Sequence, residues 1–258
     1  ESSDIYRAIQ KCVLNRSGYL YDEPHFLLQQ EVSEVGSYFS IIKAIAAGNH
    51  KLSTIAAVLE VKSTNLTKYL KTLMDLDILE RRVPVTEGNP EKSKRGLYKI
   101  KDNYLRFWFA FIYPNMSFIE SGHSGIVMDK IRKGLTTSHI GFVYEDICEE
   151  RMWELNVNNT WPFQFSKLGG YWDAKNEIDI AALDPEGKNL ILGECKYWKE
   201  PVGLNVLHAL ETKACDVAWE RDRRKVWYVL FSISGFSDEL RNHAATRDDL
   251  LLIDDGER

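Results

Sequence analysis

Two apolar segments joined by a tight turn constrain the fold of this 258-residue chain more than any other feature. The turn Asp184-Pro185-Glu186-Gly187 carries Pro early and Gly late, as β-turns favour. It separates Glu177–Leu183 from Asn189–Tyr197, and both segments have the length and apolar content of strands. The sequence therefore predicts a β-hairpin at this point.

The elements around this hairpin predict an α/β domain with a mixed sheet over residues 136–258, so that the chain as a whole is α+β. Apolar periodicity and turn residues separate the helices from the strands. The expected order is helix 138–155, strand 161–165, strand 177–183, strand 189–197, helix 203–219, strand 226–232, helix 236–246 and strand 250–253.

The pattern of residues 36–120 predicts a winged helix-turn-helix domain. A helical segment at 1–35, with helices at 4–14 and 24–35, is expected before it. Three amphipathic patterns precede two short extended segments separated by a polar loop, which is the order of elements in a winged helix. The helices are expected at 38–47, from 53 and from 63, the strands at 78–85 and 97–100, and the loop at 86–96.

An aromatic segment at 104–113 follows the predicted wing. Aromatic side chains can stack on nucleic-acid bases, but a segment that is apolar on every side is typical of a buried helix. We therefore interpret residues 104–113 as a core helix between domains.

The charge is unevenly distributed along the chain. The net charge is −5, but residues 43–101 hold twelve Lys and Arg against six Asp and Glu. A basic winged helix favours binding to the phosphates of DNA, although such charges also occur on solvated or protein-binding surfaces. The predicted DNA-binding residues are Lys62, Asn65, Lys68, Lys71, Lys92, Lys94 and Arg95.

Acidic residues interrupt the two strands of the hairpin. Glu194 follows Leu190-Ile191-Leu192-Gly193, and a carboxylate inside an apolar strand is costly unless its charge is compensated. Strand alternation places Glu177 and Asp179 on one face, with Ile178 and Ile180 on the other, and it places Glu194 beside Lys196. Pairing the strands then brings Asp179, Glu194 and Lys196 together.

These residues suit a magnesium or manganese site. Asp179 and Glu194 would bind Mg²⁺ or Mn²⁺, and Glu145 on the preceding helix would complete the ligand set. Lys196 would position the attacking water and offset negative charge on the phosphate, so Asp179, Glu194, Lys196 and Glu145 are the predicted catalytic residues. The alternative is an ion pair of Lys196 with Glu194 or Asp179 at a strand end.

Lys213, on the helix after the hairpin, has two interpretations. It could approach a phosphate, but a solvated lysine is the more common arrangement at such a position. The histidines show no metal-ligand spacing, and the four cysteines form no CxxC pair.

The hairpin resembles the signature of a known nuclease family. Asp179 followed by Glu194-Cys195-Lys196 is similar to the motif of PD-(D/E)XK, or restriction-endonuclease-like, nucleases, with Ile178 in place of the proline. Glu145 resembles the first-helix glutamate of the Holliday-junction-resolvase-like branch. The resemblance implies metal-dependent hydrolysis of DNA by residues 136–258.

The whole chain also resembles the C-terminal half of archaeal and bacterial P-loop ATPases, which carry a winged helix and a nuclease-like domain. The resemblance rests on Tyr21-Asp22-Glu23-Pro24, on Tyr104–Phe109 and on the two hairpin motifs. The sequence contains no G-x-x-x-x-G-K-[ST], so ATP binding is not implied and an ATPase part would lie outside this chain.

Together these features predict a metal-dependent DNA endonuclease with a winged-helix DNA-binding module. The alternative is a non-catalytic DNA-binding or regulatory module that partners an ATPase domain or subunit. We expect a reduced, cytoplasmic protein because the four cysteines are widely spaced. We expect no membrane-spanning segment because no apolar run approaches about 20 residues. Cleavage of both DNA strands would favour a homodimer.

Overall fold

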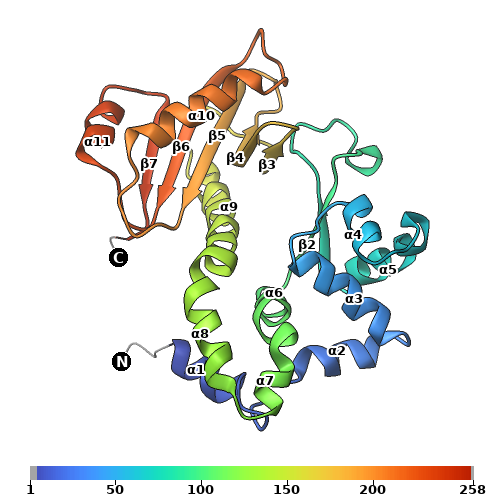
Figure 1. Cartoon of the computed structure of the whole chain (residues 1–258). Coiled ribbons are helices and arrows are strands. Elements are labelled where there is room, and N and C mark those ends of the chain that lie inside the picture. Colours follow the sequence, from blue (N-terminus) through green and yellow to red (C-terminus); the bar gives the residue numbers. More distant parts are fainter. Residues whose placement is uncertain (1–4, 257–258) are drawn as a thin grey trace. The chain divides into compact units, whose positions relative to one another are not determined.

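The computed structural model describes residues 5–256, and the chain folds as two compact units (Figure 1). The first unit contains residues up to Arg82 together with Gly96–His139. The second contains Val83–Arg95 together with the residues from Ile140 onward. Within the described residues, no helix combines the length and apolar character needed to cross a bilayer.

The first unit contains the order of elements expected of a winged helix. Its amphipathic helices bury one face each, as Leu66, Leu70 and Leu73 do on the third helix of the motif. The two strands pair antiparallel, with Leu79 opposite Ile100. The elements are α1 (Ile5–Cys12), α2 (Glu23–Glu31), α3 (Val35–Ala46), α4 (Leu52–Val58), α5 (Ser63–Asp75), β1 (Leu79–Arg82) and β2 (Leu97–Ile100); residue 4, where the first helix was expected to begin, lies outside the described residues.

The aromatic segment is buried in the first unit, as predicted. Trp108 is 1% exposed, packs against Phe39 and Phe109, and donates its indole N–H to the Tyr21 carbonyl at 2.9 Å. A buried indole needs such an acceptor, so these contacts account for the core position of Trp108. The segment forms α6 (Asn103–Phe107), a π-helical turn (Trp108–Ile112) and a 3₁₀ turn (Tyr113–Asn115), followed by α7 (Met116–Glu120) and α8 (Ser124–Leu135).

The second unit is built on a mixed five-stranded sheet, which confirms the predicted fold class. The strand order is β3-β4-β5-β6-β7, antiparallel from β3 to β5 and parallel from β5 to β7. A π-helical turn (Thr136–Ile140) leads into the first helix of the unit. The elements are α9 (Gly141–Val157), β3 (Lys167–Trp172), β4 (Glu177–Leu183), β5 (Asn189–Lys196), α10 (Leu204–Asp216), β6 (Lys225–Ser232), α11 (Asp238–Ala244) and β7 (Leu250–Asp254).

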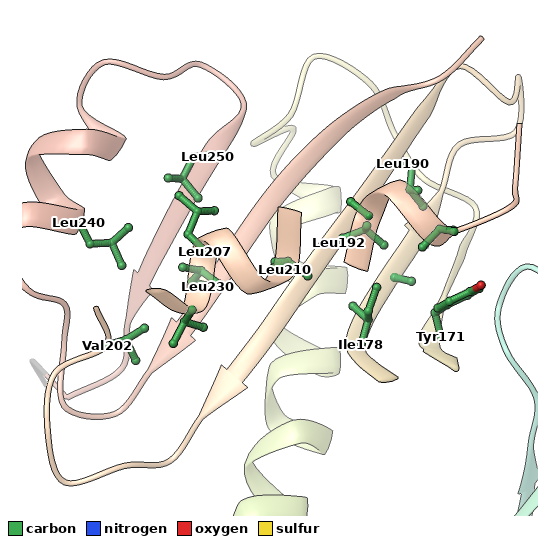
Figure 2. Close-up of a cluster of buried hydrophobic side chains, with 14 of the residues drawn as sticks. Tyr171, Ile178, Leu190, Leu192, Val202, Leu207, Leu210, Leu230, Leu240 and Leu250 are labelled. Carbon is green, nitrogen blue, oxygen red and sulfur yellow. The ribbon is translucent and has the colours of Figure 1, made fainter. Parts of the chain in front are cut away.

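Helices cover both faces of this sheet. On one face, Leu207 and Leu210 of α10 pack with Leu192 and Leu230 of the central strands (Figure 2). On the other face, Cys148 and Met152 of α9 pack with a second buried cluster. Burial on both faces explains why β5 and β6 are almost continuously apolar.

The expected strand at 161–165 is wrong, because these residues form no strand. Trp161 and Phe165 instead pack into the core below α9. The buried Asn156 side chain donates to the Phe165 carbonyl and accepts from the Phe165 amide, both at 3.0 Å. Since a side chain satisfies both backbone groups, this segment does not need a neighbouring strand.

Replacing Asn156 with Ala should reduce the free energy of unfolding by about 2–4 kcal/mol, because two buried backbone groups of Phe165 lose their partners. Urea denaturation followed by circular dichroism measures the change. Asn158→Ala, at an exposed position two residues along, is the matched control and should cost less than about 1 kcal/mol. Equal effects of the two variants would contradict this role of Asn156.

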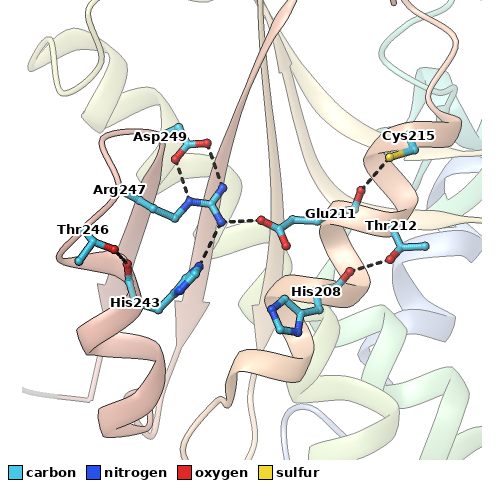
Figure 3. A network of polar contacts seen from close by, with 8 residues as sticks. All are labelled: His208, Glu211, Thr212, Cys215, His243, Thr246, Arg247 and Asp249. Atoms are coloured by element: carbon cyan, nitrogen blue, oxygen red, sulfur yellow. Dashed lines mark hydrogen bonds and ion pairs between the residues drawn. The ribbon is translucent and has the colours of Figure 1, made fainter.

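A charged network joins the helices at the β7 side of the sheet (Figure 3). The Arg247 guanidinium contacts Glu211 of α10 at 2.5 Å and both oxygens of Asp249 at 2.9 Å, and it also meets His243 of α11. The hydrogen bonds to Asp249 raise the pKa of Arg247 and lower that of Asp249. Arg247 therefore stays charged and links α10, α11 and the start of β7.

The loop between β1 and β2 belongs to the second unit. The Val85 amide donates to the Gly170 carbonyl on the edge strand β3 at 3.0 Å, and the Trp172 indole donates to the Arg95 carbonyl at 3.0 Å. These bonds explain why β1 ends at Arg82 rather than at residue 85 as expected. They also cover part of the exposed edge of the sheet.

Candidate functional site

A β-bulge sets the position of Asp179. Gly169 pairs with Ala181 and Tyr171 pairs with Ile178, so Asp179 and Ile180 together lie opposite one residue of β3. Ile178 consequently packs beneath α10 and Ile180 beneath α9. The expectation that these two isoleucines share a face is therefore wrong, because the extra residue reverses the alternation.

On β5 the alternation holds. Leu190 and Leu192 lie in the cluster beneath α10, whereas Ile191 and Cys195 lie in the cluster beneath α9. Glu194 faces α10, where it meets a lysine of that helix, and Glu194 is only 5% exposed. The Glu194 carboxylate on β5 therefore lies beneath α10.

Asp179, Glu194 and Lys196 come together at the end of the β4–β5 pairing. The backbone pairing of β4 with β5 ends at Ile180 and Gly193, and just beyond it Asp179 Oδ2 accepts a hydrogen bond from the Cys195 amide at 2.8 Å. Lys196 Nζ lies 3.3 Å from Asp179 Oδ2 and 2.5 Å from Glu194 Oε2. The predicted convergence of these three side chains is thus present in the structure.

A fourth side chain, Lys213 of α10, completes the group. Its Nζ lies 2.6 Å from Glu194 Oε1 and 2.7 Å from the Glu177 carbonyl oxygen. We refer to Asp179, Glu194, Lys196 and Lys213 as the carboxylate–lysine cluster. The expected solvated position of Lys213 is wrong. Leu210 and Ala214 of the same helix are buried, and the helical period places Lys213 beside them on the sheet-facing side.

Burial governs the electrostatics of this cluster. Burial raises the pKa of Asp179, and the neighbouring Glu194 carboxylate raises it further. Burial alone would lower the pKa of Lys196, but the charges of Asp179 and Glu194 outweigh it and raise the pKa. Lys196 therefore remains an ammonium group at neutral pH and compensates both carboxylates.

Glu145 lies in the first turns of α9, near the end of β5. The adjacent Tyr144 packs its ring against Tyr197, with centroids 5.6 Å apart, and donates to Asp255 at 3.0 Å. Glu145 is half-buried, and its charge adds to the burial that raises the pKa of the Cys195 thiol. Glu145 therefore approaches β5 from the α9 side of the sheet, whereas Glu194 faces α10.

The oxygen donors fit a hard divalent cation that also binds a phosphate. Among residues 5–256, no three His, Cys, Asp or Glu side chains are grouped so that they could hold a metal ion. Mg²⁺ commonly uses one or two carboxylates together with water and phosphate oxygens, so Asp179 and Glu194 suffice as protein ligands. The two carboxylates thus suit an ion such as Mg²⁺ or Mn²⁺, which keeps water ligands, better than a metal ion whose ligands all come from the protein.

The predicted DNA-binding residues divide between the two units. Lys62, Asn65, Lys68 and Lys71 are exposed at the start and on the outer face of α5 in the first unit. Lys92, Lys94 and Arg95 are exposed in the loop that belongs to the second unit. Arg95 already contacts Glu87 at 2.6 Å and the Trp172 carbonyl at 3.2 Å.

Comparison with known proteins relates part of the chain to a family of unknown function. The family model DUF234, described as archaea bacterial proteins of unknown function, matches residues 108–214. An uncharacterized protein of Methanocaldococcus jannaschii, MJECL04, is 39% identical over 192 residues, which is 74% of this chain. The chain spans only 42% of the length of that relative.

Two solved structures show a more distant likeness. A repair endonuclease from Pyrococcus abyssi has a TM-score of 0.27 and 10% identity, over 42% of this chain and 45% of that one. Protein VC1899 from Vibrio cholerae has a TM-score of 0.28 and 12% identity, over 93% of this chain and 53% of that one. The chain is thus similar in sequence to the archaeal protein over 192 residues, and residues 108–214 match the DUF234 model.

Proposed function

We propose that the protein is a metal-dependent DNA endonuclease that hydrolyses phosphodiester bonds in the second unit and binds DNA through α5. The observation that carries this proposal is the convergence of Asp179, Glu194 and Lys196 at one end of the β4–β5 pairing. Placing the buried Glu194 and the partly buried Asp179 side by side costs stability even with lysine partners, and a catalytic requirement would account for that cost.

Each residue has a distinct role in this proposal. Asp179 and Glu194 bind Mg²⁺ or Mn²⁺, which, when bound, polarises the phosphodiester and makes a bound water more acidic. Lys196 contacts both carboxylates, so its ammonium group lies where it can orient the attacking water and offset negative charge on the phosphate. Glu145 approaches β5 from the α9 side, so in this proposal it stays outside the two-carboxylate ligand set that the sequence predicted it would complete.

The proposal is tested by incubating the chain with supercoiled plasmid and Mg²⁺. Nicking that is lost in EDTA and in Asp179→Asn supports it, because this substitution removes one carboxylate charge while preserving the side-chain shape. Unchanged nicking in Asp179→Asn would assign the activity to a contaminant and would end the proposal. Circular dichroism of the variant checks that the fold is intact.

A second candidate is a non-catalytic DNA-binding or regulatory module. The specific observation in its favour is that each oxygen of Glu194 already accepts an ammonium group, from Lys196 and from Lys213. In this candidate the group of charges holds α10 on the sheet and has no catalytic role. DNA binding without Mg²⁺-dependent nicking would favour this candidate, and the partner ATPase and homodimer remain predictions under either function.

Replacing Lys68 and Lys71 of α5 with glutamine should weaken duplex DNA binding and lower its salt dependence. Both side chains are exposed, and each phosphate contact contributes about 0.9 to the slope of log K against log salt. Fluorescence anisotropy at several salt concentrations should give a slope smaller by about 2. The control pair Lys11→Gln and Lys133→Gln, also exposed in the first unit, should leave the slope unchanged; equal losses in both pairs would contradict a role for α5.

A further inference from the structure

Lys213 holds two oxygen atoms that a hard cation could use. From α10 its Nζ reaches Glu194 Oε1 on β5 at 2.6 Å and the Glu177 carbonyl on β4 at 2.7 Å. Carboxylate and carbonyl oxygens are the usual protein ligands of Mg²⁺, Ca²⁺ and Mn²⁺. The ammonium group thus occupies a position between donors of the kind a divalent cation requires.

The charges of the carboxylate–lysine cluster already balance. Two carboxylates, Asp179 and Glu194, face two ammonium groups, Lys196 and Lys213, and the side chain of Glu194 is only 7% exposed. A divalent cation would add two positive charges to a largely desolvated group. Binding of the cation is therefore unfavourable unless one ammonium group moves away.

Lys213 is the lysine that can leave. Lys196 contacts both carboxylates and its side chain is 18% exposed, whereas Lys213 contacts only one carboxylate and its side chain is 29% exposed. A lysine has four methylene groups that allow its charged end to swing into water. The single carboxylate contact and the greater exposure both favour movement of Lys213.

We propose that Lys213 is a built-in counter-ion of the candidate site, which neutralises Glu194 in the cation-free protein and is displaced when a divalent cation binds. This inference rests on the proposed nuclease function. It makes Lys213 a positioning residue that competes with the metal rather than a ligand or a catalytic group.

The displacement also couples the cation to DNA. A displaced ammonium group loses Glu194 but gains a partner when a phosphodiester approaches the site. DNA therefore offsets the cost of moving Lys213, and by linkage the cation and DNA strengthen each other's binding. Without DNA the protein holds its cation weakly, which limits metal loading to the complex with nucleic acid.

Titration of the full chain with Mn²⁺ tests this inference, with free Mn²⁺ followed by electron paramagnetic resonance. Lys213→Met removes the charge but keeps most of the side-chain volume, and Lys213→Gln is a second neutral variant. Lys188→Met is the matched control, because Lys188 also forms an ion pair, with Glu186 at 2.6 Å, on an exposed turn of the same unit. Asp179→Asn identifies binding at the candidate site, and melting temperatures show that each variant folds.

Without DNA, the two neutral Lys213 variants should bind Mn²⁺ about tenfold more tightly than the unmodified chain, and Lys188→Met should stay within about twofold. A DNA duplex should tighten Mn²⁺ binding to the unmodified chain more than to Lys213→Met. If Mn²⁺ binding depends on Asp179 but is not tightened in either Lys213 variant, the counter-ion role is overturned and the nuclease proposal stands. If no chain binds Mn²⁺ through Asp179, with or without DNA, both proposals fail.

Discussion

Replacing Lys196 with methionine should slow Mg²⁺-dependent nicking of plasmid DNA by about 10²–10³-fold. The Lys196 ammonium group lies between Asp179 and Glu194, at 3.3 and 2.5 Å, and under the proposed function it also faces the scissile phosphate. Methionine keeps much of the side-chain volume but cannot donate a hydrogen bond or offset charge. Initial rates of nicking at saturating Mg²⁺ measure the effect.

The Lys196 variant needs two controls. Lys188→Met removes an exposed lysine of the same unit and should leave the rate unchanged. Because Lys196→Met also leaves the buried Glu194 and the partly buried Asp179 with one fewer positive charge, its melting temperature should fall, and rates must be compared well below that temperature. A rate within threefold of the unmodified chain, in a folded variant, would remove Lys196 from the proposed mechanism.

Replacing Gly193 with alanine should lower the free energy of unfolding by about 3 kcal/mol. A Cβ atom at this position would lie 2.6 Å from Val229 Cγ1, 2.8 Å from the Val229 carbonyl oxygen and 3.1 Å from Ile180 Cβ. Val229 is fully buried on the neighbouring central strand, so neither its side chain nor its backbone can move without disturbing the sheet.

Urea denaturation compares Gly193→Ala with Gly88→Ala, where a Cβ meets nothing within 4 Å. The Gly88 variant should change stability by less than about 0.5 kcal/mol. Since Gly193 directly precedes Glu194, the Gly193 variant should also lose Asp179-dependent Mn²⁺ binding if β5 shifts. Equal stability of the two alanine variants would show that the sheet accommodates the methyl group and would contradict the close packing described here.

The sequence predicted the hairpin and the order of elements because local patterns determine both. The strands at 177–183 and 189–196 lie where the turn at 184–187 placed them. The strand at 161–165 was misplaced because its aromatic residues suit a strand as well as a core loop. The Asn156 side chain forms hydrogen bonds with both backbone groups of Phe165. This contact favours the core loop over a strand, and it is not visible in the local sequence pattern.

Part of the candidate site could also be predicted from the sequence. Strand alternation brought Glu194 and Lys196 together, and pairing brought Asp179 near them. The bulge opposite Gly170 could not be foreseen, since a bulge depends on the register between two strands. The contact of Lys213 with Glu194 joins residues 19 positions apart on different elements, so no local pattern reveals it.

The loop at 83–95 has a consequence for dividing the chain into fragments. Its ends join β1 and β2 of the first unit, while its own backbone bonds to Gly170 on the edge of the sheet. A recombinant fragment starting at residue 140 would carry β3 without this cover, and an uncovered edge strand recruits other chains. A fragment meant to keep the second unit intact therefore needs residues 83–95 as well as those from 140 onward, because the unit is built from both stretches of the chain.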